Sequence, residues 1–246
     1  MGRQLELRFR VGTAGWANPP GERARRPEVL SHLGHYATLF DFVEINSSFY
    51  QSHKRITYER WREHTPADFG FSVKLPRSVT HECALRHYRQ ELRQFVEEVE
   101  GLGQKLRVVL VQLPASLLFE AAVATRFFKS LTDLCSSRIA CEPRHVSWFT
   151  ERADDILRTR GVSRVATDPA RALGGDSPGG SLRLAYYRLH GSPKIYYSTY
   201  SADFLAHLAS QMRALTSRTK DICCVFDNTA RHESWLNAQQ LCAVLR

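Results

Sequence analysis

The chain has 246 residues, of which 34 are Lys or Arg and 25 are Asp or Glu, so its formal charge is +9. Hydrophobic residues make up 43%, which excludes a disordered chain, and 14 Gly and 10 Pro without a fixed period exclude collagen-like fibres. No stretch approaches the ~20 apolar residues of a membrane span, and residues 1–16 lack a signal-peptide core, so we expect a cytoplasmic protein without a membrane partner.

Apolar strand-like runs recur along the chain, and helix-like segments separate most of them. The runs begin near Arg8, Phe42, Phe69, Leu106, Arg138, Val162, Leu184 and Ile222. Apolar residues three and four apart predict helices over 28–40, 85–101 and 121–135, and shorter ones over 57–64, 153–160, 202–217 and 235–245. Strands that alternate with helices favour parallel β-α units, because parallel strands need crossover connections.

The number of units favours a single TIM (β/α)₈-type barrel domain over residues 1–246. Eight units in ~250 residues is the size of such a barrel. A doubly wound open sheet is the alternative, although it more often has about five to seven strands. The segment between Asp168 and Leu184 is rich in Gly and Ser, so we expect an irregular sixth unit without a regular helix.

Side chains alternate between the two faces of each expected strand, and one face is polar near the strand ends. The apolar face, which includes Val43, Val73, Cys223 and Val225, is expected to contact the helices. By the same alternation Asp227 is expected to face away from the barrel axis. The polar face is expected to line the C-terminal mouth, where barrel active sites lie, and comprises Glu44, Asn46, Ser72, Lys74, Gln112, Glu142, Asp168, Arg188, His190 and Asn228.

Short motifs at these strand ends resemble those of a known family. They are GTAGW at 12–16, VEINSSFY at 43–50, Lys74 with THE at 80–82, QLP at 112–114, EPRHVSW at 142–148, RLHG at 188–191, FDNT at 226–229 and NA at 237–238. Together they are similar to the YecE-like family, catalogued as domain of unknown function 72, over essentially the whole chain. The resemblance implies a TIM barrel with an open C-terminal cleft and no established activity. The chain departs from the family at Ala17-Asn18-Pro19-Pro20 and at Asp227-Asn228, where paired Asn is usual.

The polar strand ends carry a mixture of carboxylates, imidazoles and cations. No P-loop, dinucleotide fingerprint, G-x-S-x-G elbow or H-E-x-x-H pair is present. Glu142, His145, Asp168 and His190 follow successive strands and are candidate ligands of a divalent metal ion. Lys74, Arg144 and Arg188 would clamp a phosphate. The first hypothesis is therefore metal-assisted hydrolysis of a phosphoester, with nucleic acid among the substrates, and with Glu142, Asp168, His190 and Lys74 as catalytic residues.

Two other functions are compatible with the same residues. If the carboxylates pair with Lys74, Arg144 and Arg188, no metal is needed, and the cleft would bind nucleic acid or a phosphorylated ligand without catalysis. Alternatively, Glu44 and Glu142 are a carboxylate pair of the kind that glycosidases use. Almost all of the basic residues are Arg. This composition suits a phosphate-bearing partner, but it is equally explained if Arg is simply the usual basic residue of the source organism. We expect a monomer whose substrate-binding residues are Glu44, Asn46, Tyr50, His81, Arg144, Trp148, Arg188, Tyr197 and Asn228.

Overall fold

The computed structural model describes residues 8–219 and 221–246, and its strands form one ten-stranded sheet. Every neighbouring pair of strands is parallel except β6 and β8. The order in the sheet is β7-β9-β10-β1-β2-β3-β4-β5-β6-β8. The strands are β1 Arg8–Ala14, β2 Phe42–Ile45, β3 Gly70–Lys74, β4 Leu106–Gln112, β5 Arg138–Glu142, β6 Val162–Arg164, β7 Ala166–Asp168, β8 Gly179–Gly180, β9 Ala185–Leu189 and β10 Asp221–Phe226.

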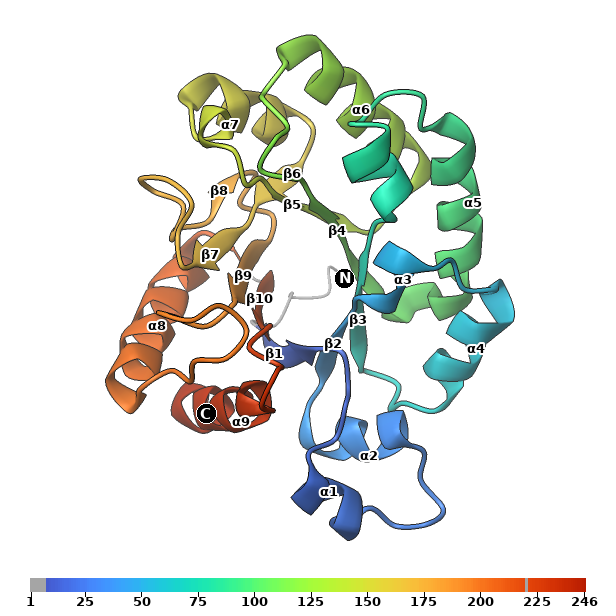
Figure 1. Ribbon diagram of the computed structural model, residues 1–246, viewed down its shortest axis with the longest axis vertical. Helices are drawn as coiled ribbons and strands as arrows, with labels where there is room; N and C mark the ends of the chain where they lie inside the picture. Colours follow the sequence, from blue (N-terminus) through green and yellow to red (C-terminus); the bar gives the residue numbers. More distant parts are fainter. Residues whose placement is uncertain (1–7, 220) are drawn as a thin grey trace, which may run out of the picture.

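The sheet closes into a barrel through the segment 162–168. β6 pairs with β5, β7 pairs with β9, and only Val165 separates β6 from β7. One continuous segment therefore connects the two ends of the strand order, and Figure 1 shows the resulting ring with helices around it. The predicted TIM-like barrel is confirmed. It has ten strands instead of eight because the sixth strand is divided at Val165 and the return segment adds β8.

Helices cover the outside of the barrel, and two of them begin later than predicted. Ser31 caps α2 by accepting a hydrogen bond from the amide of Gly34, so this helix begins at His32 and not at 28. Leu85 and His87 have left-handed backbone angles, which delay α5 to Arg89. The helices are α1 Pro20–Arg25, α2 His32–Leu39, α3 Ser47–Tyr50, α4 Arg55–Glu63, α5 Arg89–Val99, α6 Ala121–Leu134, α7 Glu151–Thr159, α8 Ala202–Ala214 and α9 Glu233–Leu245, with short helical turns at Ser78–Glu82, Glu100–Lys105, Val146–Trp148 and Leu215–Ser217. None of these helices, over residues 8–219 and 221–246, is long and apolar enough to span a membrane.

The buried apolar residues form two clusters, one inside the barrel and one between the barrel and the helices. The inner cluster contains Phe42, Val108, Leu110, Ala140, Val165, Leu184, Tyr186, Cys223 and Val225. The larger, outer cluster takes Cys224 and Phe226 from the same strand, β10. The prediction that Cys223 and Val225 face the helices was therefore wrong. Both faces of β10 are apolar, so the alternation of polarity carries no signal along this strand.

No helix forms between β7 and β9, as the Gly- and Ser-rich sequence predicts. The chain instead turns back and forms β8, which pairs antiparallel with β6. The guanidinium of Arg164 holds this return segment by donating to the carbonyl of Gly174 at 3.1 Å. Gly180 has a φ of +60°, and a Cβ there would lie 2.8 Å from the carbonyl oxygen of Val162, so only glycine fits beside β6.

Candidate functional site

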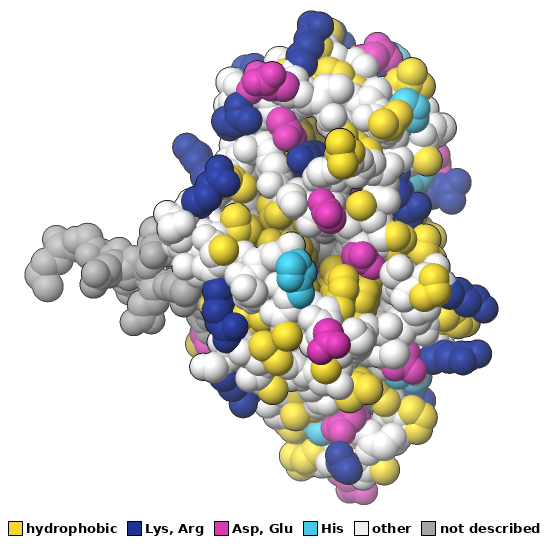
Figure 2. Space-filling view, turned by 90° about the vertical axis from the view of Figure 1, so that its left-hand side faces the viewer, with side chains coloured by type: hydrophobic (Ala, Val, Ile, Leu, Met, Phe, Trp, Pro, Cys, Tyr) yellow, Lys and Arg dark blue, Asp and Glu magenta, His cyan; other side chains and the backbone are white. Residues whose placement is uncertain are grey.

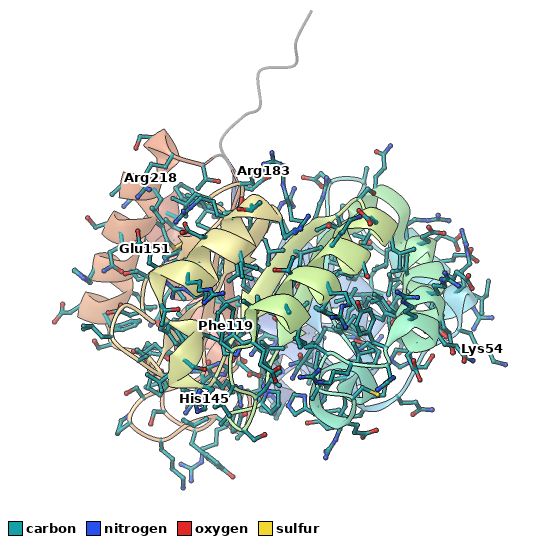
Figure 3. The ribbon with its side chains drawn as sticks, turned by 90° about the horizontal axis from the view of Figure 1, so that it is seen from above. Lys54, Phe119, His145, Glu151, Arg183 and Arg218 are labelled. Carbon is teal, nitrogen blue, oxygen red and sulfur yellow. The ribbon has the colours of Figure 1, made fainter. Side chains whose placement is uncertain are left out.

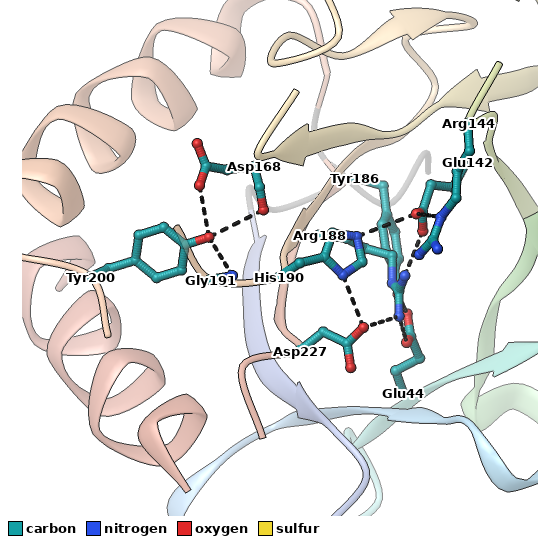
Figure 4. Close-up of polar contacts among 10 residues, drawn as sticks. All are labelled: Glu44, Glu142, Arg144, Asp168, Tyr186, Arg188, His190, Gly191, Tyr200 and Asp227. Atoms are coloured by element: carbon teal, nitrogen blue, oxygen red, sulfur yellow. Dashed lines mark hydrogen bonds and ion pairs between the residues drawn. The ribbon is translucent and has the colours of Figure 1, made fainter. Parts of the chain in front are cut away.

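Arg188 on β9 is fully buried at the C-terminal end of the barrel, where it binds three carboxylates. Its Nε and Nη2 donate to the two oxygens of Glu44 at 3.0 and 2.7 Å, and its Nη1 donates to Glu142. Nη2 also donates to Asp227 at 3.1 Å, as Figure 4 shows. Burial by itself would lower the pKa of Arg188, but Glu142, Glu44 and Asp227 outweigh it and hold that pKa well above its usual range. The guanidinium is therefore a permanent charge that organises the network.

His190 lies two residues further along and is placed between two of the same carboxylates. Its Nδ1 is 3.0 Å from Oδ2 of Asp227, and its Nε2 is 3.3 Å from Oε1 of Glu142. Burial would lower the pKa of His190, but Glu142 and the contact with Asp227 raise it. Burial likewise opposes ionisation of Glu142 and Asp227, but Arg188 and His190 outweigh it. They hold the pKa of Glu142 well below its usual value and lower the pKa of Asp227. The cluster is thus a buried set of paired charges.

We expect the imidazole of His190 to remain protonated at pH values where a free histidine has lost its proton. Replacing Asp227 by Asn should lower the pKa of His190, because one of its two carboxylate partners disappears. Nitrogen-15 spectra of the imidazole as a function of pH measure this titration. Asp168→Asn is the matched control, since the Asp168 carboxylate is bound by Tyr200 instead. Equal shifts of the His190 titration in both variants would contradict the assignment of its partner.

A cavity of about 400 Å³ opens above this cluster at the C-terminal mouth of the barrel. Lys74, at the end of β3, lines it with only 7% of its surface exposed, and its Nζ lies 3.9 Å from the centre of the Phe49 ring. No carboxylate of residues 8–219 and 221–246 is in ion-pair contact with Lys74. Burial and, next, the nearby Arg188 lower the pKa of Lys74 to about 8. Glu44, Glu142 and Asp227 oppose this shift without contacting the amine, so the cavity contains a buried amine with no carboxylate in contact among the described residues.

Three further basic side chains line the same cavity. The Nε of Arg144 donates to Glu142 at 3.1 Å, while the rest of its guanidinium is available to the mouth. Arg77 is 58% exposed and lies 3.3 Å from Glu82. Burial, followed by Lys74 and the two arginines, lowers the pKa of His81. The positive groups thus repel one another, which favours an anionic ligand at this position. The remaining lining residues are Asn46, Phe49, Tyr50, Gln112, Tyr196, Asp227 and Thr229.

The four candidate metal ligands do not come together. Oδ1 of Asp168 accepts a hydrogen bond from the hydroxyl of Tyr200 at 2.9 Å, away from Glu142 in Figure 4. The Nδ1 of His145 accepts from the amide of Ser147 and caps the turn at Val146–Trp148. In the described part of the chain no group of three or more His, Cys, Asp and Glu is arranged to hold a metal ion. These four residues therefore do not form a metal site in the part of the chain that the structure describes.

Asp168 lies on the outward side of its strand and not on the predicted inward side. In the parallel pairing of β7 with β9, Thr167 is opposite Arg188, whose side chain points inward, and Asp168 is opposite Leu189. Leu189 belongs to the outer apolar cluster, so Asp168 shares its outward side. Asp227 takes the inward place instead, since it continues the alternation of Cys223 and Val225.

Three other candidate residues lie outside the mouth cavity. Trp148 is buried, donates from Nε1 to the carbonyl of Leu117 at 2.9 Å, and packs edge-on against Phe119. Asn228 is also buried, and its Nδ2 donates to Ser198 and Asn237, which attaches the loop after β9 to α9. Tyr197 is exposed and contacts Lys194, while its neighbour Tyr196 lines the cavity. Tyr196 adopts a left-handed φ of 71°, which no feature of the sequence signals.

The chain is similar to several proteins that share this fold. Residues 10–246 match the model of the family described as protein of unknown function DUF72. The UPF0759 protein YecE of Escherichia coli K12 is 30% identical over 164 residues, which cover 64% of this chain but only 58% of the length of that relative. A DUF72 family structure from Enterococcus faecalis V583 has a TM-score of 0.83 at 19% identity and covers 97% of this chain and 95% of its own. A DUF72 family structure from Thermotoga maritima MSB8 has a TM-score of 0.79 at 26% identity. The match covers 96% of this chain and 98% of the Thermotoga chain.

Proposed function

The chain belongs to the DUF72 family, and from this premise we propose that the mouth of its barrel binds a phosphate-bearing ligand. Lys74 carries this proposal, because it is a buried amine at the cavity wall without a carboxylate partner among the described residues. Burying an unpaired cation is costly, so such a group favours a ligand that supplies the missing negative charge. Arg77 and Arg144, at the same cavity, add guanidinium donors that match phosphate oxygens.

The carboxylates near the mouth offset this positive charge only in part, because Arg188 and His190 already bind them. Glu44 and Glu142 are fully buried below it, and both are bound by Arg188. Asp227 reaches the cavity wall, but its Oδ2 is shared by Arg188 and His190. A phosphate group at the mouth would therefore meet Lys74, which has no ion pair among the described residues, beside two arginines that each contact one carboxylate. Gln112, Tyr196 and Thr229 add polar groups for the remaining oxygens.

Binding is better supported than cleavage. A metal-assisted reaction needs ligands that converge, and Asp168 and His145 are turned toward other partners. A bound dianion would also raise the pKa of Lys74 and keep its amine protonated, which suits a phosphate contact and not a general base. Glycosidase chemistry needs two accessible carboxyl groups, whereas Glu44 and Glu142 share Arg188 in the buried cluster.

Titration with inorganic phosphate and with a simple phosphate monoester, followed by calorimetry, tests this proposal. We expect Arg77→Gln to weaken binding roughly 3- to 10-fold, because a charge-assisted contact to phosphate is lost. Arg86→Gln serves as the control, since Arg86 is bonded to Glu120 and does not line the cavity. Undetectable binding of both ligands, or equal weakening by the two substitutions, would argue against a phosphate site at the mouth.

A further inference from the structure

A second cavity, of about 720 Å³, lies at the opposite, N-terminal end of the barrel. Its walls come from α7, the return segment 178–183, residues 216–219, and the first residues of β5 and β10. A regular barrel would have a helix between β7 and β9, but here the chain returns through β8. In Figure 1 β8 lies between α7 and α8, where that helix would stand. The missing helix therefore leaves this second cavity as an open groove on the surface.

The groove is lined by basic and hydroxyl side chains. Its arginines are Arg138, Arg158, Arg183 and Arg218, and its hydroxyl groups belong to Ser181, Thr216, Ser217 and Thr219. Figure 3 places Arg183 and Arg218 at the end of the barrel away from His145. Figure 2 shows dark-blue basic side chains mainly along the two margins of the side that faces the viewer, rather than at its centre.

The carboxylates in the groove are already bound. Asp154 receives hydrogen bonds from Arg164 at 2.8 and 3.2 Å, and Asp221 lies 3.5 Å from Arg138. Arg158 is paired with Asp155. Arg183 and Arg218 are exposed and form no ion pair with any residue that the structure describes. Two guanidinium groups on different segments thus remain available to an external anion.

We propose that this groove binds the phosphate backbone of a nucleic acid duplex, separately from the ligand of the mouth. Guanidinium groups, hydroxyl groups and backbone amides are the groups that contact phosphate oxygens in protein–DNA interfaces. The available cations are exposed and come from two segments, so they suit successive phosphates better than one small ion. The lining residues include no aromatic side chain on which unpaired bases would stack, which favours backbone contact to a duplex over a single strand.

An acidic peptide fits the groove less well. Peptide recognition needs apolar anchors as well as charge, and Pro178 and Leu182 are the only apolar side chains other than glycine that line the described groove. Contacts restricted to phosphates carry no sequence information, so affinity should depend on salt and not on base sequence.

Fluorescence anisotropy with a short labelled DNA duplex tests the proposal on the full chain. We expect the double substitution Arg183→Glu/Arg218→Glu to weaken binding at least about 10-fold and to reduce the salt dependence by about two phosphate contacts. The control Arg89→Glu/Arg93→Glu makes the same change of charge on the exposed surface of α5 and should alter affinity less than about 2-fold. Both pairs are exposed, and thermal melting confirms that each variant is folded.

Four results would contradict the assignment. The first is equal weakening by the two double variants, which would mean that only net charge matters. The second is weakening by Lys74→Met/Arg77→Gln in place of the groove substitutions, which would move the duplex to the mouth. The third is displacement of the duplex by poly-glutamate as effectively as by unlabelled DNA, which would favour an acidic protein partner. A duplex affinity that depends strongly on sequence would also contradict contacts made only to phosphates.

Discussion

Replacing Arg188 by Met is expected to destabilise the folded protein by about 3–5 kcal/mol, because removal of one partner leaves buried charges uncompensated. Arg188 is fully buried and binds Glu44, Glu142 and Asp227. Methionine fills a similar volume, so the loss reflects charge more than a cavity. Urea unfolding at neutral pH measures the free energy of unfolding of the parent and the variant.

The pH dependence and a second substitution separate this charge effect from a packing effect. The pKa values of Glu142 and Asp227 are lowered in the folded parent, so the stability they supply is present above their unfolded pKa values and is lost as pH falls through their folded ones. In Arg188→Met the orphaned acids can be protonated, so the difference from the parent should shrink in acid. Adding Glu44→Gln to Arg188→Met should restore part of the lost stability. A variant as stable as the parent would refute the buried network.

Replacing Lys74 by Met is expected to weaken binding of inorganic phosphate by more than about 10-fold while making the free protein more stable, by roughly 1–3 kcal/mol. Lys74 is a buried cation near Arg188 and has no carboxylate in contact among the described residues, so its charge is costly until an anion arrives. Calorimetry gives the affinity, and thermal or urea unfolding without phosphate gives the stability. The two changes should have opposite signs.

The titration of Lys74 gives this prediction a distinctive pH profile. Its pKa is lowered to about 8, so the amine loses its proton above that pH, and the phosphate affinity of the parent should fall there. The same fall should be absent in Lys74→Met. The stability advantage of the variant should be complete below pH 8 and fade above it, as the parent no longer carries the buried charge. Lys54→Met is the control, because Lys54 is exposed and does not line the mouth cavity. Loss of stability together with affinity would indicate that Lys74 has a structural role instead.

Alternation along the strands predicted much of the site where one face is polar and the other apolar. On β2, β3, β5 and β9 it placed Glu44, Lys74, Glu142 and Arg188 on the inward side, and the structure brings all four to one end of the barrel. The period of two is a local property of an extended chain, so it can be read without knowing the fold. On β10 the same reasoning failed because both faces are apolar, and Asp227 was assigned to the wrong side.

The sequence by itself determined the barrel and most of the polar strand ends, because apolar periodicity and the alternation of strands with helices are recorded locally along the chain. Only the tertiary structure decided which charges pair. Glu44 and Arg188 are separated by 144 positions, and their contact depends on the closure of the sheet and on the relative register of β2 and β9. Asp168 lies on the outward side of β7, where Tyr200 binds it, and Asp227 takes the place beside Arg188 and His190. Partner choice is set by distances across the barrel, and no local pattern of residues contains those distances.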